Sequence, residues 1–232
     1  MFDQALTTAL DFLELGGPVV TLLVALSVLS FAIVLVKFWQ FWTLRVGRHG
    51  PVHKAMHFWS LNNRSKAHQS LVGQNGVLSA LVARTMYLLE QRGENRDDAE
   101  EVLTAQAMQS IHRLQSGFRA LDSIAQIAPL LGLFGTVLGM IEAFQKLQGA
   151  GSSVDPSLLA GGIWVALLTT AVGLAVAMPT SLCLTYFESR VANERMEMES
   201  ALVELFNPGL QFSSQTDRGS SSFDTDGVEA PA

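Results

Sequence analysis

Three long stretches of the sequence are apolar and carry no charged residue. They cover residues 18–36, 124–141 and 156–187. About 20 apolar residues in a helix cross the hydrocarbon core of a bilayer, and a helix satisfies its own backbone hydrogen bonds there. The pattern therefore predicts an all-α membrane protein with three transmembrane helices.

The remaining sequence divides into segments by polarity and by turn residues such as the glycines and serines of residues 149–153. The expected organisation, in chain order, is an N-terminal segment (1–17), transmembrane helix 1 (18–42), a helical region (43–120), transmembrane helix 2 (121–144), a turn (145–157), transmembrane helix 3 (158–187), a helix extension (188–207) and a disordered tail (208–232).

Two of the three membrane helices are expected to extend far beyond the bilayer. Apolar residues recur at helical spacing through Val102, Ile111 and Leu114, and no strong breaker precedes the second apolar stretch. We therefore predict one helix over residues 95–144, with its apolar stripe covered by other copies of the chain. The third helix also continues without a breaker, to Phe206. The polar, glycine-containing stretch 64–76 is predicted to be a linker.

The charges predict the orientation of the chain in the membrane. Residues 1–17 carry acidic but no basic side chains, whereas region 43–119 carries most of the 15 Lys and Arg residues. The turn at 145–157 contains only Lys146 as a basic residue. Because Lys and Arg concentrate in cytoplasmic loops, we expect the large loop and the C-terminus in the cytoplasm, and the N-terminus outside it.

The sequence contains no convincing set of catalytic or metal-binding residues. Cys183, the single cysteine, lies in the third apolar stretch, where a thiol behaves as a small hydrophobic group. His49, His53 and His57 share a helical face, but no cysteine or carboxylate stands at a recognisable ligand spacing, so a solvated face is the favoured interpretation. No catalytic residue, metal, cofactor or nucleic acid is predicted, and an enzyme is the weakest interpretation.

The second and third apolar stretches each carry small residues and a threonine on one helical face. Small faces let membrane helices approach closely, whereas a small face that also carries a hydroxyl can line a narrow polar space. Helix packing and pore lining therefore both remain open. The small residues are Gly132, Gly135, Gly139, Ala166, Gly173 and Ala177, and the threonines are Thr136 and Thr170.

Two motifs carry a resemblance to a known family. The segments Pro129–Met140 (PLLGLFGTVLGM) and Gly162–Pro179 (GIWVALLTTAVGLAVAMP) resemble the MotA/TolQ/ExbB proton-channel family, and ExbB most of all. The resemblance implies a homopentamer in the bacterial inner membrane, with a periplasmic N-terminus. It also implies an ExbD-like single-span partner, and transfer of proton-driven work to a TonB-like protein for outer-membrane uptake of iron chelates or vitamins.

The resemblance places the ion pathway at Thr136 and Thr170, with one departure. Better-known ExbB members have a glutamate five residues before the third-helix threonine, and this chain has Val165 there. No ionisable residue stands at mid-depth in any apolar stretch, so a partner must supply the carboxylate if protons cross. The alternatives are a TolQ-like subunit, a gliding or stator motor subunit, and a non-conducting membrane scaffold.

Overall fold

The computed structural model describes residues 2–47, 49–91, 96–149 and 156–207, and this part of the chain is helical without strands. The predicted tail at 208–232, most of the turn at 145–157 and the expected helix start at Asn95 lie outside the described residues. The helices are α1 (Phe2–Thr43), α2 (Gly50–Ser60), α3 (Arg64–Leu71), α4 (Val77–Gln91), α5 (Arg96–Gln115), α6 (Phe118–Gly149) and α7 (Pro156–Phe206).

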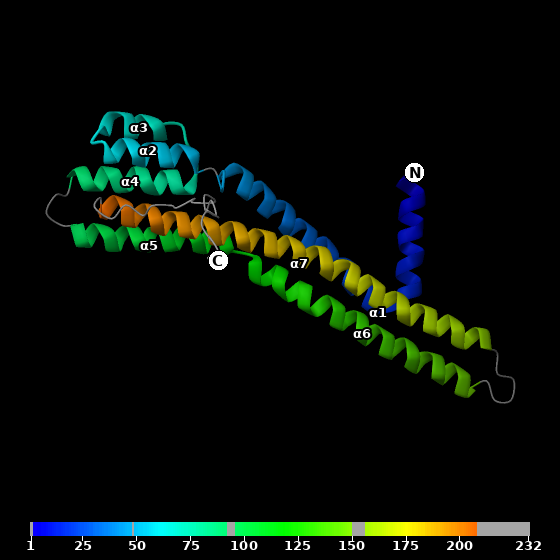
Figure 1. The fold of residues 1–232 in the computed structure, drawn as a ribbon. Coiled ribbons are helices and arrows are strands. Elements are labelled where there is room, and N and C mark those ends of the chain that lie inside the picture. The colour runs from blue at the N-terminus through cyan, green and yellow to red at the C-terminus, as the bar shows by residue number, and fades with distance from the viewer. Residues whose placement is uncertain (1, 48, 92–95, 150–155, 208–232) are drawn as a thin grey trace, which may run out of the picture.

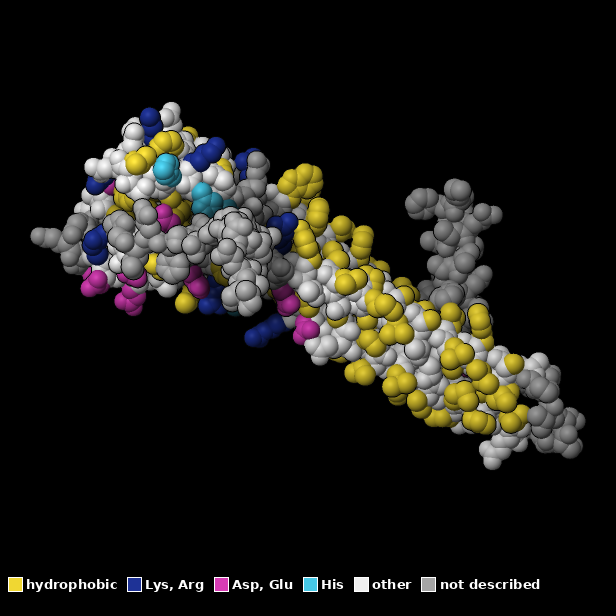
Figure 2. All heavy atoms as spheres, in the orientation of Figure 1, with side chains coloured by type: hydrophobic (Ala, Val, Ile, Leu, Met, Phe, Trp, Pro, Cys, Tyr) yellow, Lys and Arg dark blue, Asp and Glu magenta, His cyan; other side chains and the backbone are white. Residues whose placement is uncertain are grey.

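The helices form an elongated membrane bundle and a head (Figure 1). The membrane bundle consists of α1, α6 and the first part of α7. The head consists of α2, α3, α4 and α5, gathered around the second part of α7. Hydrophobic side chains cover the visible face of the bundle, whereas most charged side chains lie on the head (Figure 2). Three helices are long and apolar enough to cross a membrane, which confirms the predicted all-α fold with three membrane helices.

α1 bends before it enters the bundle and then packs against α7. The bend is at Gly17, whose φ of 65° is readily adopted only by a residue without a side chain. Further along, Thr180 of α7 donates a hydrogen bond to Ser30 of α1 at 3.2 Å, and both side chains are buried. This hydroxyl pair satisfies two polar groups that would be costly if left unpaired in hydrocarbon.

α7 is the longest helix and connects the bundle to the head. Its 51 residues span about 77 Å at 1.5 Å per residue, which is more than twice the thickness of a hydrocarbon core. Beyond the membrane segment it buries one stripe, spaced three or four residues apart, and the head packs on it. The stripe is formed by Phe187, Val191, Glu194, Met198, Ala201, Leu202 and Leu205.

We predicted that other copies of the chain bury the apolar stripe of α5, and this prediction is wrong for two of the three named residues. Ile111 and Leu114 are buried within the single chain, in the core cluster that also contains Met198 of α7. Val102 is 52% exposed. The contact between α5 and α7 was not predicted, because the sequence pattern shows which face of a helix is apolar but not which neighbouring helix packs on that face.

The expected continuous helix over residues 95–144 is also wrong. α5 ends at Gln115 and α6 begins at Phe118, with Gly117 between them at φ 83°. A glycine in the left-handed region is a common helix C-terminus, because an added Cβ would be strained there. The break therefore marks the boundary between head and bundle.

The predicted linker at 64–76 contains a helix. Asn63 caps α3 by accepting a hydrogen bond from the Lys66 N–H at 3.3 Å, and Ala67 and Leu71 are buried against the head. An N-cap of this kind satisfies one of the free N–H groups at the start of a helix. The sequence of α3 is polar because only two of its eight residues are buried against the neighbouring helices.

Lys37 of α1 stabilises the break between α5 and α6. Its ammonium donates to the Leu114 carbonyl at 3.0 Å, to Ser116 Oγ at 3.3 Å and to Gln40 Oε1 at 2.8 Å, and it lies 5.4 Å from the centre of the Phe118 ring. Lys37 is 3% exposed, so these contacts replace its water shell. Cations are favourable at helix C-termini, where free carbonyls carry partial negative charge.

Lys37→Met removes the charge while keeping a side chain of similar length. We expect a loss of about 1.5–3 kcal/mol in stability, because the Leu114 carbonyl loses a hydrogen bond from a charged donor. The midpoint of thermal unfolding of the detergent-solubilised protein measures the change. Lys146→Met is the control, because Lys146 pairs with Glu142 on the surface. An equal drop in both variants would refute the capping role of Lys37.

Candidate functional site

The backbones of α6 and α7 approach closely where glycine faces glycine. A methyl group at Gly173 would lie 2.6 Å from the Ala128 carbonyl oxygen and 3.2 Å from the Gly132 Cα. A methyl group at Gly132 would lie 3.0 Å from the Thr169 carbonyl oxygen. These neighbours are backbone atoms and cannot rotate away. A methyl group therefore does not fit at Gly173 in this arrangement, and at Gly132 it would require the opposing backbone to shift.

The other predicted small residues also lie at contacts between helices of the same chain. A methyl group at Gly135 would lie 2.7 Å from Thr169 Oγ1, and one at Gly139 would lie 3.1 Å from the Ala166 Cβ. Ala177 is 5% exposed and belongs to a small apolar cluster with Leu23 of α1 and Ala128 of α6. In the single chain, these residues form the packing surface between α6, α7 and α1.

The hydroxyls of two neighbouring threonines of α7 lie within hydrogen-bond distance of one carbonyl of α6. Thr169 Oγ1 lies 3.2 Å from the Gly132 oxygen and also 2.7 Å from the Ala166 oxygen of its own helix. Thr170 Oγ1 lies 3.1 Å from the same Gly132 oxygen. The absent side chains of Gly132 and Gly173 let the helices come near enough for these hydrogen bonds. The Gly132 carbonyl is therefore the polar centre of the α6–α7 contact.

The three threonines of the site differ in their exposure to the surroundings of the chain. Thr169 is 2% exposed, whereas Thr136 and Thr170 are partly exposed. Thr136 Oγ1 donates to the Leu133 carbonyl of its own helix at 2.6 Å. The structure thus brings Thr170 onto α6 and leaves the Thr136 hydroxyl bonded within its own turn. Thr169 was not among the predicted site residues, although the sequence shows Thr169 and Thr170 as two adjacent hydroxyls in an apolar stretch.

The site contains no group that readily gains or loses a proton. The charged residues of α6 nearest to it in sequence are Asp122 and Glu142, and α7 has none before Glu188. Val165, where related proteins have a glutamate, is half-buried. A hydroxyl can donate and accept a hydrogen bond but does not ionise at accessible pH. α6 and α7 thus bring hydroxyls and carbonyls to this contact, and no ionisable side chain.

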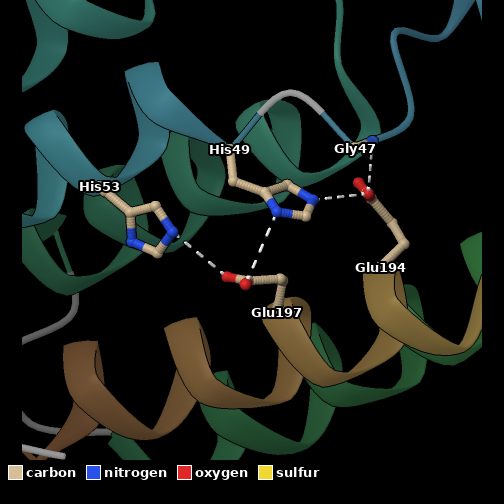
Figure 3. A network of polar contacts seen from close by, with 5 residues as sticks. All are labelled: Gly47, His49, His53, Glu194 and Glu197. Atoms are coloured by element: carbon tan, nitrogen blue, oxygen red, sulfur yellow. Dashed lines mark hydrogen bonds and ion pairs between the residues drawn. The ribbon is translucent and has the colours of Figure 1, made fainter. Parts of the chain in front are cut away.

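The histidine face of α2 differs from the predicted solvated face. His49 lies within 4 Å of both Glu194 and Glu197 of α7, and His53 lies 3.4 Å from Glu197 (Figure 3). His57 is exposed. The spacing along the sequence could not reveal these carboxylates, because they come from a helix about 145 residues away. Within the described part of the chain, no group of three His, Cys, Asp or Glu residues could hold a metal ion.

The fold and the site define a class of protein: a helical membrane protein with three spanning helices, two of which meet at paired glycines and carry hydroxyls near the middle of their apolar stretches. A sequence model of the MotA/TolQ/ExbB proton channel family matches residues 71–200, more than half of the chain. The chain belongs to this family. The match includes α4, α5, α6 and most of α7, and thus both helices of the site.

Individual relatives carry ExbB and TolQ names. Biopolymer transport protein exbB1 of Vibrio cholerae is 50% identical over 68 residues, which are 29% of this chain and 30% of the relative. The ExbB-like 1 protein of Synechocystis, named as a putative biopolymer transport protein, is 31% identical over 72% of this chain and 65% of the relative. The Tol-Pal system protein TolQ of Haemophilus influenzae is 28% identical over 80% of this chain and 88% of the relative. The chain thus spans less than two thirds of the first two of these relatives.

Gly173→Ala tests the close approach of α6 and α7. The added methyl would press on the Ala128 carbonyl, so we expect a loss of about 1–3 kcal/mol as the helices separate or shift. Denaturant or thermal unfolding of the purified protein measures it. Gly161→Ala is the matched control on the same helix, because a methyl group there meets nothing within 4 Å. If both variants were as stable as the parent, the glycine contact would not be as close as described.

Proposed function

We propose that this protein is a proton-channel motor subunit of the bacterial inner membrane that works with an ExbD-like single-span partner. The observation that carries the proposal is the α6–α7 site, which holds hydroxyls in a helix contact but has no ionisable group of its own. A proton path needs a group that binds and releases the proton, usually an intramembrane carboxylate. The partner would contribute that carboxylate.

The partly exposed threonines are the residues that we assign to the pathway. A carboxylate in a low-dielectric site is stabilised by hydrogen bonds from neighbouring hydroxyls. Thr136 and Thr170 can donate such bonds by turning away from the carbonyls that they contact now. Val165 cannot take the part of a glutamate. Thr169, which is buried between α6 and α7, would hold the two helices together instead.

Several copies of the chain would surround the partner helices, and we propose a pentamer. The head leaves apolar side chains open to solvent, with Met108 and Met196 each 60% exposed. A groove of about 440 Å³ between α5 and α7 is lined by residues of both helices, including Met108 and Leu202. Exposed apolar patches of this kind commonly mark contacts with other subunits.

The proposed orientation follows from the charges. The head carries most of the basic residues and would lie in the cytoplasm, whereas the N-terminus would lie in the periplasm. Proton flow through the assembly would drive motion that a TonB-like protein transmits to outer-membrane receptors for iron chelates or vitamins. The names of the ExbB relatives, which describe biopolymer transport, support this output.

A TolQ-like role is the second candidate. The match to the TolQ protein covers 88% of that relative, more than the match to exbB1 does. Deletion of the gene separates the two roles. Loss of growth on chelated iron with an intact envelope supports the ExbB-like role, whereas a leaky, detergent-sensitive envelope supports the TolQ-like role. If the protein is a gliding or stator motor subunit, cells without the gene would lose motility instead. If it is a non-conducting scaffold, the reconstituted protein would show no proton flux.

Thr170→Val and Thr170→Ser test whether the hydroxyl serves transport. Valine keeps the shape and removes the hydroxyl, whereas serine keeps the hydroxyl. With the partner co-reconstituted in vesicles, we expect the valine variant to lose proton flux about tenfold or more, the size of one hydrogen bond to a charged group. The serine variant should retain most of the flux. Equal flux in the parent and in a Thr136→Val, Thr170→Val double variant would refute the pathway role.

A further inference from the structure

The His49 imidazole lies between two carboxylates of α7, at the end of the connector that joins α1 to α2 (Figure 3). Its Nε2 lies 3.0 Å from Glu194 Oε2, and its Nδ1 lies 3.6 Å from Glu197 Oε1. The same Glu194 oxygen accepts a hydrogen bond from the Gly47 N–H at 3.1 Å. Glu194 is 2% exposed, so water does not replace these partners. Both ring nitrogens therefore face carboxylate oxygens.

This arrangement suits an imidazole that carries a proton on both ring nitrogens. A neutral imidazole has one N–H donor and one nitrogen lone pair, whereas the imidazolium donates from both nitrogens. With both carboxylates ionised, a neutral His49 would point its lone pair at one of them, which is repulsive. A second ring proton turns that repulsion into an attraction between the imidazolium and the Glu197 carboxylate, 3.6 Å away. The geometry is thus that of a bound proton shared among His49, Glu194 and Glu197.

Other charged groups of α2 and α7 stand around this arrangement. His53 of α2 lies 3.4 Å from the second oxygen of Glu197 and is 60% exposed. The Arg190 guanidinium of α7 lies beside Gly47, with its Nη1 3.1 Å from where a methyl group on that glycine would be. Arg190 also donates to the Tyr186 hydroxyl at 3.2 Å. Lys54 of α2 is exposed.

A further ion pair lies within the head, between α3 and α4. On α4, Glu90 lies 3.3 Å from His68 of α3, and Arg84 is exposed. The two glutamates of α7 thus face one half-buried histidine and one exposed histidine. Because His49 lies close to both glutamates, a positive charge on its ring would offset part of their negative charge.

We propose that His49, Glu194 and Glu197 form a proton-binding site that clamps the α1–α2 connector onto α7. With the proton bound, the connector is held through His49 and through the Gly47 amide. On its release, one contact to α7 becomes repulsive and the connector loosens. Among side chains, histidine most often changes charge near neutral pH, so pH is the variable that tests the clamp. The site does not depend on whether the membrane helices conduct protons.

The clamp links proton occupancy in the head to two membrane helices. α1 leads directly into the connector. α7 carries both glutamates in its head segment and Thr170 in its membrane segment. Loosening the connector frees the end of α1 relative to α7. The site therefore acts as a pH-responsive joint between these helices.

Hydrogen–deuterium exchange of the assembled full chain tests the clamp, read from peptides covering residues 44–53. Comparing the parent with His49→Gln at one pH cancels the intrinsic effect of pH on exchange. At about pH 6 we expect exchange in the parent to be about tenfold slower, the size of one charge-assisted hydrogen bond. At about pH 8 that difference should have largely disappeared. His57→Gln is the control, because His57 is exposed on the same helix.

Glu197→Gln separates the bound proton from simple packing. Its amide can donate an N–H to an unprotonated Nδ1, so the connector should stay slowly exchanging at both pH values. Exchange in α6 peptides should match the parent in every variant, which excludes global unfolding. The proposal is overturned if His49→Gln differs from the parent equally at both pH values, or at neither, or if Glu197→Gln loosens at about pH 8 as the parent does.

Discussion

The close approach of two glycines in the membrane, Gly132 on α6 and Gly173 on α7, is the constraint on which the rest of this structure depends. In lipid, little hydrophobic driving force joins helices, so association depends on close packing and on hydrogen bonds between them. The absence of both side chains brings the Gly132 carbonyl within reach of Thr169 and Thr170. This contact fixes α6 against α7 at mid-depth, and α7 carries that position out to the head.

The same constraint shapes what the site can do. A tight glycine contact leaves no room for an ionisable side chain between α6 and α7, and Val165 introduces none. The chain offers hydroxyls and backbone carbonyls, which orient and stabilise a charge but do not store a proton. Ionisable side chains meet instead at the head, where Lys37 caps the end of α5 and where His49 lies between Glu194 and Glu197. The membrane contact of α6 and α7 thus contains no ionisable side chain, whereas the head brings several together.

Much of the fold was predictable because the bilayer imposes long uncharged stretches that no other feature of the sequence imitates. The all-α class and three membrane helices followed from those stretches. The break at Gly117 was missed, because the apolar stripe continues across it and the Lys37 cap comes from a helix 77 residues away. The helix at 64–71 was missed because its apolar pattern is weak: it is stabilised by the Asn63 cap and by only two buried residues. The Thr169 hydrogen bond and the carboxylates at His49 depend on contacts between distant segments, which periodicity does not reveal.

The most direct measurement of the central contact is the proximity of Gly132 and Gly173 in the assembled protein in lipid. Solid-state NMR of protein labelled at glycine Cα, with labelled chains diluted into unlabelled ones, reports only contacts within a chain. The account predicts a Gly132–Gly173 cross-peak that survives dilution, because each added Cβ would lie within 3.4 Å of the opposite Cα. A cross-peak that vanishes on dilution, or is absent in both samples, would contradict the account and leave the small faces free to line a space between subunits.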